Sequence, residues 1–191
     1  MVRLRYKTPE DWTSAVMGDL DSFLQDHAHA ERKVATSALT LAAQQSQKPE
    51  LVESMIELAQ EELTHFRQVH DLLRDRGQTI GQDRPDRYMG SLFKLLRKSD
   101  VNEYLLDRLL LFGIVEARGW ERFRMISLAM SKGPVRDFYR ELTRCEARHH
   151  LLFIRLAKRY FAEEVLKARL DELLDREAEI VSNLPFRAAL H

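Results

Sequence analysis

The stretch CEARHHLLFIRL, from Cys145 to Leu156, indicates the fold because a glutamate and a histidine three residues apart interrupt a helical apolar pattern. A second stretch, AQEELTHF from Ala59 to Phe66, carries the same Glu-x-x-His spacing at Glu62 and His65. Side chains three residues apart lie on one face of a helix, so both members of such a pair can reach the same ion. The two stretches therefore predict two helices that present metal ligands.

Around each motif, apolar residues recur at alternating steps of four and three, the pattern of a helix that buries one face. Four long helices carry this pattern, and each has a glutamate in the middle of its apolar face: Glu31, Glu62, Glu116 and Glu146. The first and third of these helices carry a lone glutamate, whereas the second and fourth carry Glu-x-x-His. Four unrelated polar residues are the alternative interpretation, but buried carboxylates are rare without a partner.

Four carboxylates that face one another in a core repel, and a pair of metal ions removes this conflict. Two lone glutamates and two Glu-x-x-His motifs are the ligand set of ferritin-like di-iron or di-manganese bundles. Carboxylate and imidazole donors favour iron or manganese. The predicted ligands are the terminal Glu31 and Glu116, the bridging and catalytic pair Glu62 and Glu146, and the imidazoles of His65 and His149.

The composition fits one all-α domain over residues 1–191, because apolar residues make up 45%, charged residues 31%, and glycine and proline are scarce. The 30 basic and 30 acidic residues balance, which argues against a generic nucleic-acid coat or a membrane-surface protein. A single cysteine excludes an internal disulfide framework and fits a cytoplasmic protein. Neither an apolar run of about 18 residues nor a signal-peptide pattern is present.

Capping residues and prolines divide the chain into helices. Thr8-Pro9 begins a short helix, Lys48-Pro49 and Lys132-Gly133-Pro134 each separate two long ones, and a loop from Gln78 to Arg87 begins a long crossover. The predicted helices cover residues 9–17, 19–45, 49–76, 88–97, 100–130, 134–161 and 162–182. The expected architecture is a ferritin-like four-helix bundle with extra N-terminal, crossover and C-terminal helices.

Four segments together resemble the tRNA hydroxylase family called MiaE: HAHAERKVATSAL (27–39), AQEELTHF (59–66), VEARGWERF (115–123) and CEARHHLLF (145–153). VEARGWERF is the distinctive segment, since other di-iron bundles share the ligand pattern. The resemblance covers nearly the whole chain, and all six ligand positions are filled. It implies a non-haem di-iron monooxygenase that hydroxylates the isopentenyl side chain of 2-methylthio-N6-isopentenyladenosine next to the tRNA anticodon.

The resemblance also implies partners. Dioxygen would be the co-substrate, and a separate reductase or ferredoxin-like donor would supply electrons, because the chain has no dinucleotide-binding fingerprint. A locally basic segment would hold the phosphates of the anticodon stem-loop, although ordinary solvated faces are the alternative. The predicted tRNA-binding residues are Arg84, Arg87, Lys94, Arg97 and Lys98.

The alternative function is a ferritin- or bacterioferritin-like ferroxidase or iron store with no nucleic-acid partner. Leu63 counts against bacterioferritin, which has a haem-binding methionine at this position of the motif. The additional helices favour an enzyme with a substrate pocket over a bare storage bundle. We therefore expect a monomer or a small oligomer rather than a large shell.

Four residues near the predicted ligands have open interpretations. His27 either supports a ligand or is a hydrogen-bonded core histidine. Gly119 leaves space for dioxygen or substrate, or else permits close helix packing. Glu61 either orients a ligand histidine or lies on a solvated face. His150 lies about 100° around the helix from His149, so we expect it beside the metal-facing side rather than on it.

Overall fold

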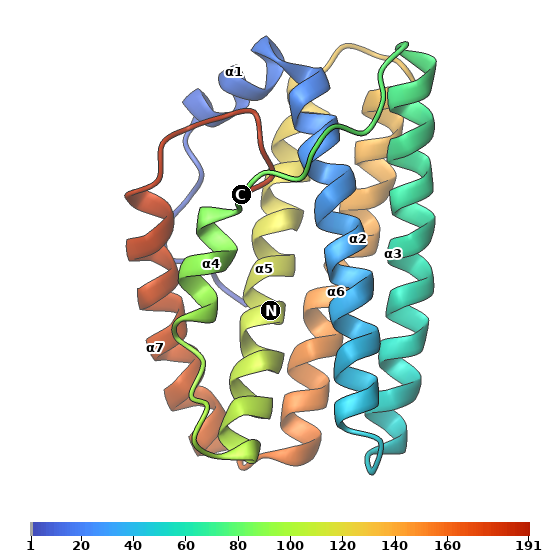
Figure 1. Ribbon diagram of the computed structural model, residues 1–191. Helices are drawn as coiled ribbons and strands as arrows, with labels where there is room; N and C mark the ends of the chain where they lie inside the picture. Colours follow the sequence, from blue (N-terminus) through green and yellow to red (C-terminus); the bar gives the residue numbers. More distant parts are fainter. Residues whose placement is uncertain (1) are drawn as a thin grey trace. The chain divides into compact units, whose positions relative to one another are not determined.

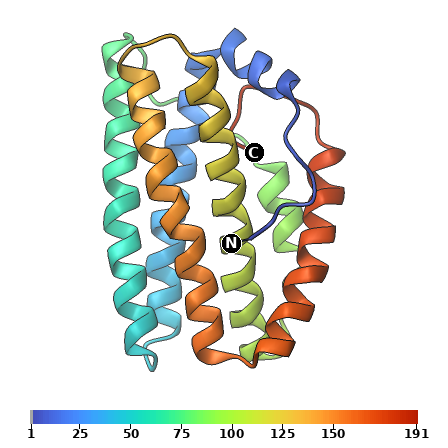
Figure 2. The ribbon, with the colours of Figure 1, turned by 180° about the vertical axis from the view of Figure 1, so that it is seen from behind.

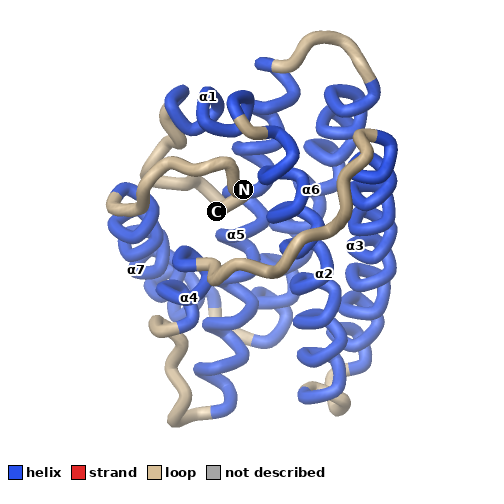
Figure 3. Tube along the Cα trace, turned by 45° about the horizontal axis from the view of Figure 1, so that its top comes forward, coloured by secondary structure: helices blue, strands red, loops and turns tan. Residues whose placement is uncertain are grey.

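The computed structural model describes residues 2–191, and this range folds into helices and loops without a strand (Figure 3). The helices are α1 Glu10–Gly18, α2 Leu20–Gln44, α3 Pro49–Asp75, α4 Arg87–Phe93, α5 Val101–Ala129, α6 Pro134–Tyr160 and α7 Glu163–Ser182. The all-α prediction is confirmed, and every predicted helix is present. No described helix has the length and apolar character needed to cross a membrane.

The chain divides into two compact units, which we name after their longest elements. The α5 unit comprises the residues up to Thr13, Pro85–Phe186 and His191, and the α2 unit comprises Ser14–Arg84 and Arg187–Leu190. The single domain predicted over residues 1–191 stays a prediction.

In the α2 unit, α2 and α3 form an antiparallel hairpin (Figure 1). Asp19 caps the start of α2, where its carboxylate accepts a hydrogen bond from the Ser22 N–H. Pro49 occupies the first turn of α3, where its missing N–H costs no hydrogen bond. The buried faces of both helices carry the predicted apolar residues, including Leu24, Leu41 and Leu58.

A left-handed glycine ends α3 and starts the crossover. Gly77 has a φ of 71°, which glycine adopts without a steric penalty. The next N–H, that of Gln78, donates to the Leu73 carbonyl at 2.9 Å, and the Gly77 N–H donates to Arg74. This pattern satisfies carbonyls that the helix end would leave unpaired.

In the α5 unit, α5 packs against α6 and α7, and α4 packs against α7 (Figure 2). Every residue from Leu105 to Gly119 is buried, so this middle part of α5 has no exposed face. The amphipathic α6 buries only one face, which includes Tyr139, Leu142 and Phe153. Buried residues therefore surround the middle part of α5, whereas they form a single stripe along α6.

Helix α4 ends at Phe93, earlier than the predicted residue 97, and the chain leaves it in tight turns in which the N–H groups of Lys94 and Leu95 donate to the carbonyls of Ser91 and Leu92. The Arg97 N–H donates to Oδ2 of Asp107 on α5 at 2.9 Å. Its guanidinium also contacts Asp107 and Glu103. Helical periodicity cannot reveal that a side chain of another helix accepts the Arg97 N–H, so the helix predicted from the sequence is too long.

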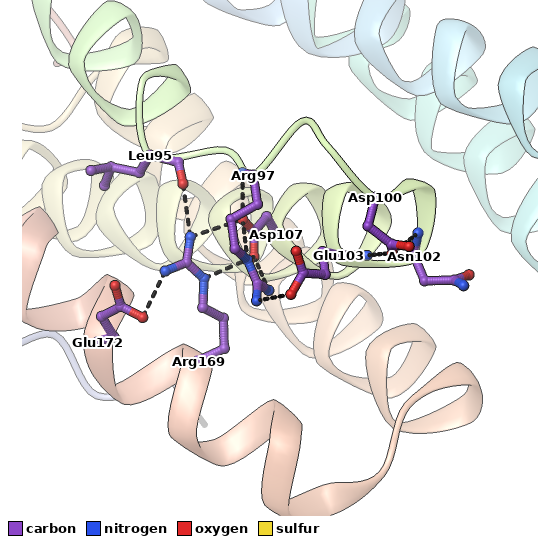
Figure 4. A network of polar contacts seen from close by, with 8 residues as sticks. All are labelled: Leu95, Arg97, Asp100, Asn102, Glu103, Asp107, Arg169 and Glu172. Carbon is purple, nitrogen blue, oxygen red and sulfur yellow. Dashed lines mark hydrogen bonds and ion pairs between the residues drawn. The ribbon is translucent and has the colours of Figure 1, made fainter.

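Asp107 is the centre of a polar network that joins the crossover, α5 and α7 (Figure 4). Its side chain is fully buried, and Arg97 and Arg169 both donate to it at 2.7–2.8 Å. Arg169 also donates to the Leu95 carbonyl at 2.7 Å. Burial raises the pKa of Asp107, but the hydrogen bonds from Arg169 and Arg97 outweigh this effect and lower it. The carboxylate is therefore charged at neutral pH.

Asp107→Asn is expected to lower the free energy of unfolding at pH 7 by about 3–5 kcal/mol, because it leaves two arginines beside a neutral group. The carboxylate stabilises the fold above the ordinary aspartate pKa, and this contribution is lost as pH falls through the lower folded-state pKa. The difference between variant and wild type should therefore shrink below about pH 4. Chemical denaturation of the variant and the wild type between about pH 3 and pH 7 measures this difference.

The matched control for this prediction is Glu141→Gln, which removes the exposed ion pair between Glu141 and Arg144 on α6. Exposed pairs contribute less than about 1 kcal/mol, so this variant should unfold nearly as the wild type does. Equal effects of the two substitutions would contradict a stabilising role for the Asp107 network.

Candidate metal centre

The α2 unit contains a buried cluster formed by Glu31 of α2 and the Glu62–His65 pair of α3. Each residue offers one ligand atom, and these atoms lie within 4.8 Å of one another. Nδ1 of His65 is 3.1 Å from Oε2 of Glu62 and 3.7 Å from Oε2 of Glu31. The helical spacing predicted for Glu-x-x-His thus places both side chains of α3 on the face that meets Glu31.

The α5 unit contains a second cluster of the same composition. Glu116 of α5 and the pair Glu146 and His149 of α6 each offer a ligand atom, again within 4.8 Å of one another. Nδ1 of His149 is 3.5 Å from Oε2 of Glu146. All six side chains in the two clusters belong to residues exposed by 7% or less. Each unit therefore brings together the three ligands predicted for it.

The two carboxylates around His65 strongly change its acidity. Burial by itself lowers the pKa of the imidazole, but hydrogen bonds to Glu31 and Glu62, together with their negative charge, raise the pKa to about 11. His65 therefore carries a proton at neutral pH and balances the charge of the carboxylates. A metal ion would replace this proton, because ligating imidazole is neutral.

His27 contacts a predicted ligand directly. Its Nε2 atom is hydrogen-bonded to Oε1 of Glu31, one helical turn further along α2. The His27 side chain is fully buried, and its ring stacks on Phe23 with centroids 6.0 Å apart. Both interpretations from the sequence hold together here, since His27 is a hydrogen-bonded core histidine whose partner is itself a predicted ligand.

The remaining neighbours of the ligands have simpler roles. Glu61 is exposed, as expected for a solvated face. A Cβ atom at Gly119 would lie 3.7 Å from Phe123, an ordinary van der Waals distance, so close packing does not explain this glycine. His150 is buried, and its Nδ1 lies 3.2 Å from the Glu146 carbonyl. Burial lowers the pKa of His150.

The segment VEARGWERF has two chemically different sides. Glu116 belongs to the cluster of candidate metal ligands, whereas Arg118, about 200° further around α5, forms two hydrogen bonds with Glu177 of α7 at 2.9 and 3.0 Å. The Tyr88 hydroxyl donates to the same carboxylate at 3.0 Å. Arg118 also donates to Glu121, which accepts a hydrogen bond from the hydroxyl of Thr8. This buried network ties α4, α7 and the N-terminal segment to α5.

Comparisons with known proteins decide the family. Residues 2–191 match the family described as "tRNA-(MS[2]IO[6]A)-hydroxylase (MiaE)". The chain belongs to the MiaE family.

Two relatives carry the name "tRNA 2-(methylsulfanyl)-N(6)-isopentenyladenosine(37) hydroxylase". The protein of Pseudomonas putida is 33% identical over 188 residues, which cover 93% of this chain and 91% of that protein. The protein of Salmonella typhimurium is 30% identical over 132 residues, or 69% of this chain and 48% of that protein. The similarity to the first relative thus extends along nearly the whole of both chains, as expected between members of the MiaE family.

A solved structure supports the fold of this MiaE family member. It is described as "Protein 43 with aldehyde deformylating oxygenase activity from Synechococcus", and it is 31% identical with a TM-score of 0.92. The likeness covers 98% of this chain and 94% of that one. The predicted class, all-α and ferritin-like, is confirmed by this likeness.

The residues predicted to bind tRNA have different environments. Arg84 in the α2 unit is exposed, and so are three residues of the α5 unit: Arg87, Lys94 and Lys98. Arg97 is different, because its guanidinium donates to Asp107 and Glu103. Arg97 therefore has a structural role in the fold, and its predicted role in tRNA binding stays a prediction. RNA contacts by the other four residues stay a prediction.

Proposed function

We propose that this MiaE family member is a non-haem di-iron monooxygenase. Its substrate would be the isopentenyl side chain of 2-methylthio-N6-isopentenyladenosine next to the anticodon of tRNA. The observation that carries the proposal is a buried Glu-Glu-His cluster in each unit of a chain that belongs to this family. Each cluster would supply three ligands to a pair of iron ions.

The donor chemistry fits this assignment. Carboxylate oxygens and imidazole nitrogens suit iron and manganese, and the only cysteine, Cys145, is not among the clustered donors. Glu31, Glu62 and His65 would hold metal in the α2 unit, and Glu116, Glu146 and His149 would do so in the α5 unit. Because unpaired buried carboxylates are costly, a cation pair would also stabilise the folded chain.

The bound iron pair would supply the activation of dioxygen, and the protein would contribute position and shielding. The six ligands would fix the ions in a buried site, so bulk water would have little access to the reaction. His27 would hold one oxygen of Glu31 and leave the other directed at the metal. Electrons would come from a separate donor, either a reductase or a ferredoxin-like protein. We further propose that the protein acts in the cytoplasm as a monomer or a small oligomer.

The deciding experiment combines the iron-loaded protein, a chemical or protein reductant, dioxygen and tRNA that carries the isopentenyl modification. Digestion to nucleosides and mass analysis should show a gain of one oxygen atom on the modified adenosine. Iron-free protein and an oxygen-free reaction are the controls. Consumption of dioxygen without a hydroxylated nucleoside would overturn the proposed substrate.

The rival function is a ferroxidase or iron store without a nucleic-acid partner. Storage proteins form large closed shells and mineralise added iron, whereas this chain should elute as a monomer or small oligomer. Size-exclusion chromatography with light scattering measures the assembly, and absorbance after iron addition follows mineral growth. A large shell with rapid mineralisation and no nucleoside product would favour the rival.

His27→Ala is expected to weaken iron binding about 10–100-fold, the usual cost of removing a residue that orients a metal ligand. Without the hydrogen bond, the Glu31 carboxylate can rotate away from the ion. An equilibrium titration with ferrous iron under anaerobic conditions measures the affinity. His70→Ala, at an exposed histidine of α3, is the matched control and should bind iron as the wild type does. Equal affinity of the His27 variant and the wild type would refute the orienting role.

A further inference from the structure

A pocket of 200 Å³ lies in the α2 unit, where three segments distant in sequence meet. Its walls come from the start of α2 between Asp19 and His29, the linker after α3 and the C-terminal segment. The polar side chains that matter here are Ser22, Gln25, Asp26, Gln82, Arg84 and Arg187. Of these six residues, only Arg84 is predicted from the sequence to bind tRNA, and none belongs to the candidate metal centre.

The linker wall is fixed to α2 by specific contacts, and Figure 3 shows this loop crossing the helix. Nε2 of His29 lies 2.9 Å from the Gly81 carbonyl, and Lys33 pairs with Asp83 at 2.6 Å. A Cβ atom at Gly81 would come within 2.5 Å of Oε1 of Gln25, the movable end of that side chain, so the linker backbone lies directly against Gln25. Arg84, next to the anchored Asp83, is thereby held at the pocket.

The C-terminal wall is fixed to the same helix face. The Leu190 N–H donates to Oδ2 of Asp26 at 2.8 Å, and both Ala189 and Leu190 are buried. This contact places the segment that begins with Arg187 beside Ser22, Gln25 and Asp26 of α2. Gln25 and Asp26 follow Ser22 by three and four residues, so all three share one face of the helix. The pocket is therefore a built feature, with each wall held by its own hydrogen bonds.

The chemistry of the walls matches a ribonucleotide better than a simple anion. Arg84 and Arg187 are balanced by two carboxylates in the same pocket, Asp19 and Asp26. Guanidinium groups recognise phosphate, carboxylates recognise sugar hydroxyls, and side-chain amides recognise base edges. The volume of 200 Å³ is below the range of about 300–1,000 Å³ typical of sites for drug-sized ligands, so the pocket has room for part of one nucleotide and not for a dinucleotide.

We propose that this pocket binds one ribonucleotide of the RNA substrate, with Arg84 and Arg187 on its phosphate and Asp26 and Gln25 on its ribose and base. The inference rests on the proposed function, because it takes RNA as the substrate. It explains how a chain with no net charge can bind RNA, since a few placed contacts replace a large basic surface.

The test measures binding of a fluorescent anticodon stem-loop RNA to the full chain at several salt concentrations. Arg187→Gln should weaken binding about tenfold and lower the slope of log affinity against log salt by about one, as expected for a lost phosphate contact. Arg67→Gln, at an exposed arginine of α3, is the control and should change neither quantity. Wild-type affinity of Arg187→Gln would overturn the proposal.

A second variant separates a pocket from a basic surface. Ala188→Trp fills the cavity without changing the charge of the protein, so it should weaken RNA binding about tenfold. Because the phosphate of the excluded nucleotide also loses its contact with the arginines, the salt slope should fall as it does in Arg187→Gln. Circular dichroism and a melting curve confirm that the variant is folded. If folded Ala188→Trp bound RNA as tightly as the wild type, the arginines would belong to an open surface and the pocket assignment would fail.

Two further outcomes keep this inference separate from the proposed function. If the wild type bound RNA through Arg187 but never hydroxylated tRNA, the proposed function would fail and the pocket would stand. If it hydroxylated tRNA and Arg187→Gln bound RNA normally, the pocket would fail alone. Binding of free adenosine monophosphate that depends on Arg187, with RNA binding that does not, would identify a free-nucleotide site and overturn the proposal.

Discussion

His149→Ala is expected to abolish hydroxylation and to reduce bound iron below two ions per chain. The imidazole of His149 shares a buried cluster with Glu116 and Glu146, and alanine offers no donor in its place. Replacing a residue that merely orients a ligand costs about 10–100-fold. Loss of the ligand itself should therefore leave less than about a hundredth of the wild-type rate. Metal analysis and the nucleoside assay measure the two effects independently.

The adjacent histidine provides a closely matched control. His150 is buried like His149, but its Nδ1 contacts the Glu146 carbonyl of its own helix. His150→Ala should retain iron stoichiometry, although the cavity it leaves will lower thermal stability. Circular dichroism should show that both variants remain helical. Iron loss in His150→Ala with full iron content in His149→Ala would place the ligand one residue away from our assignment.

The clustering of the candidate ligands could be predicted from the sequence because the geometry of each Glu-x-x-His pair is local. A helix fixes the relative positions of Glu62 and His65, so a spacing of three residues is enough to place both on one face. A glutamate within an apolar stripe signals a buried charge that needs a partner. These two rules also identified Glu31 and Glu116 without knowledge of tertiary contacts.

Long-range pairs could not be predicted in this way. Arg118 and Glu177 are 59 residues apart, and neither spacing nor composition indicates which acid meets which base. The end of α4 was misplaced for the same reason, because Asp107 on another helix captures the Arg97 N–H. The pocket was also missed, since Leu190 and Asp26 are 164 residues apart.

Glu177→Gln is expected to lower the free energy of unfolding by about 3–5 kcal/mol. The side chains of Arg118 and Glu177 are both fully buried, so the substitution removes the fully buried one of the two carboxylates that pair with the guanidinium, Glu177 and Glu121. Burial raises the pKa of Tyr88 well above its usual value, and the Glu177 charge adds to this effect. The phenol is therefore neutral and donates a hydrogen bond to Glu177. The amide oxygen of a glutamine would accept this hydrogen bond less strongly than the charged carboxylate does.

Arg118→Met alone should destabilise the chain by a similar amount, because it leaves the Glu177 carboxylate buried without its cation. The double variant Arg118→Met, Glu177→Met should recover most of the loss, since a buried ion pair replaced by apolar side chains is often nearly neutral. A double-mutant cycle from urea denaturation gives the coupling energy directly. Additive losses would contradict the pairing. Full iron binding by the double variant would show that the Arg118 side of the segment VEARGWERF stabilises α5 without determining the position of Glu116.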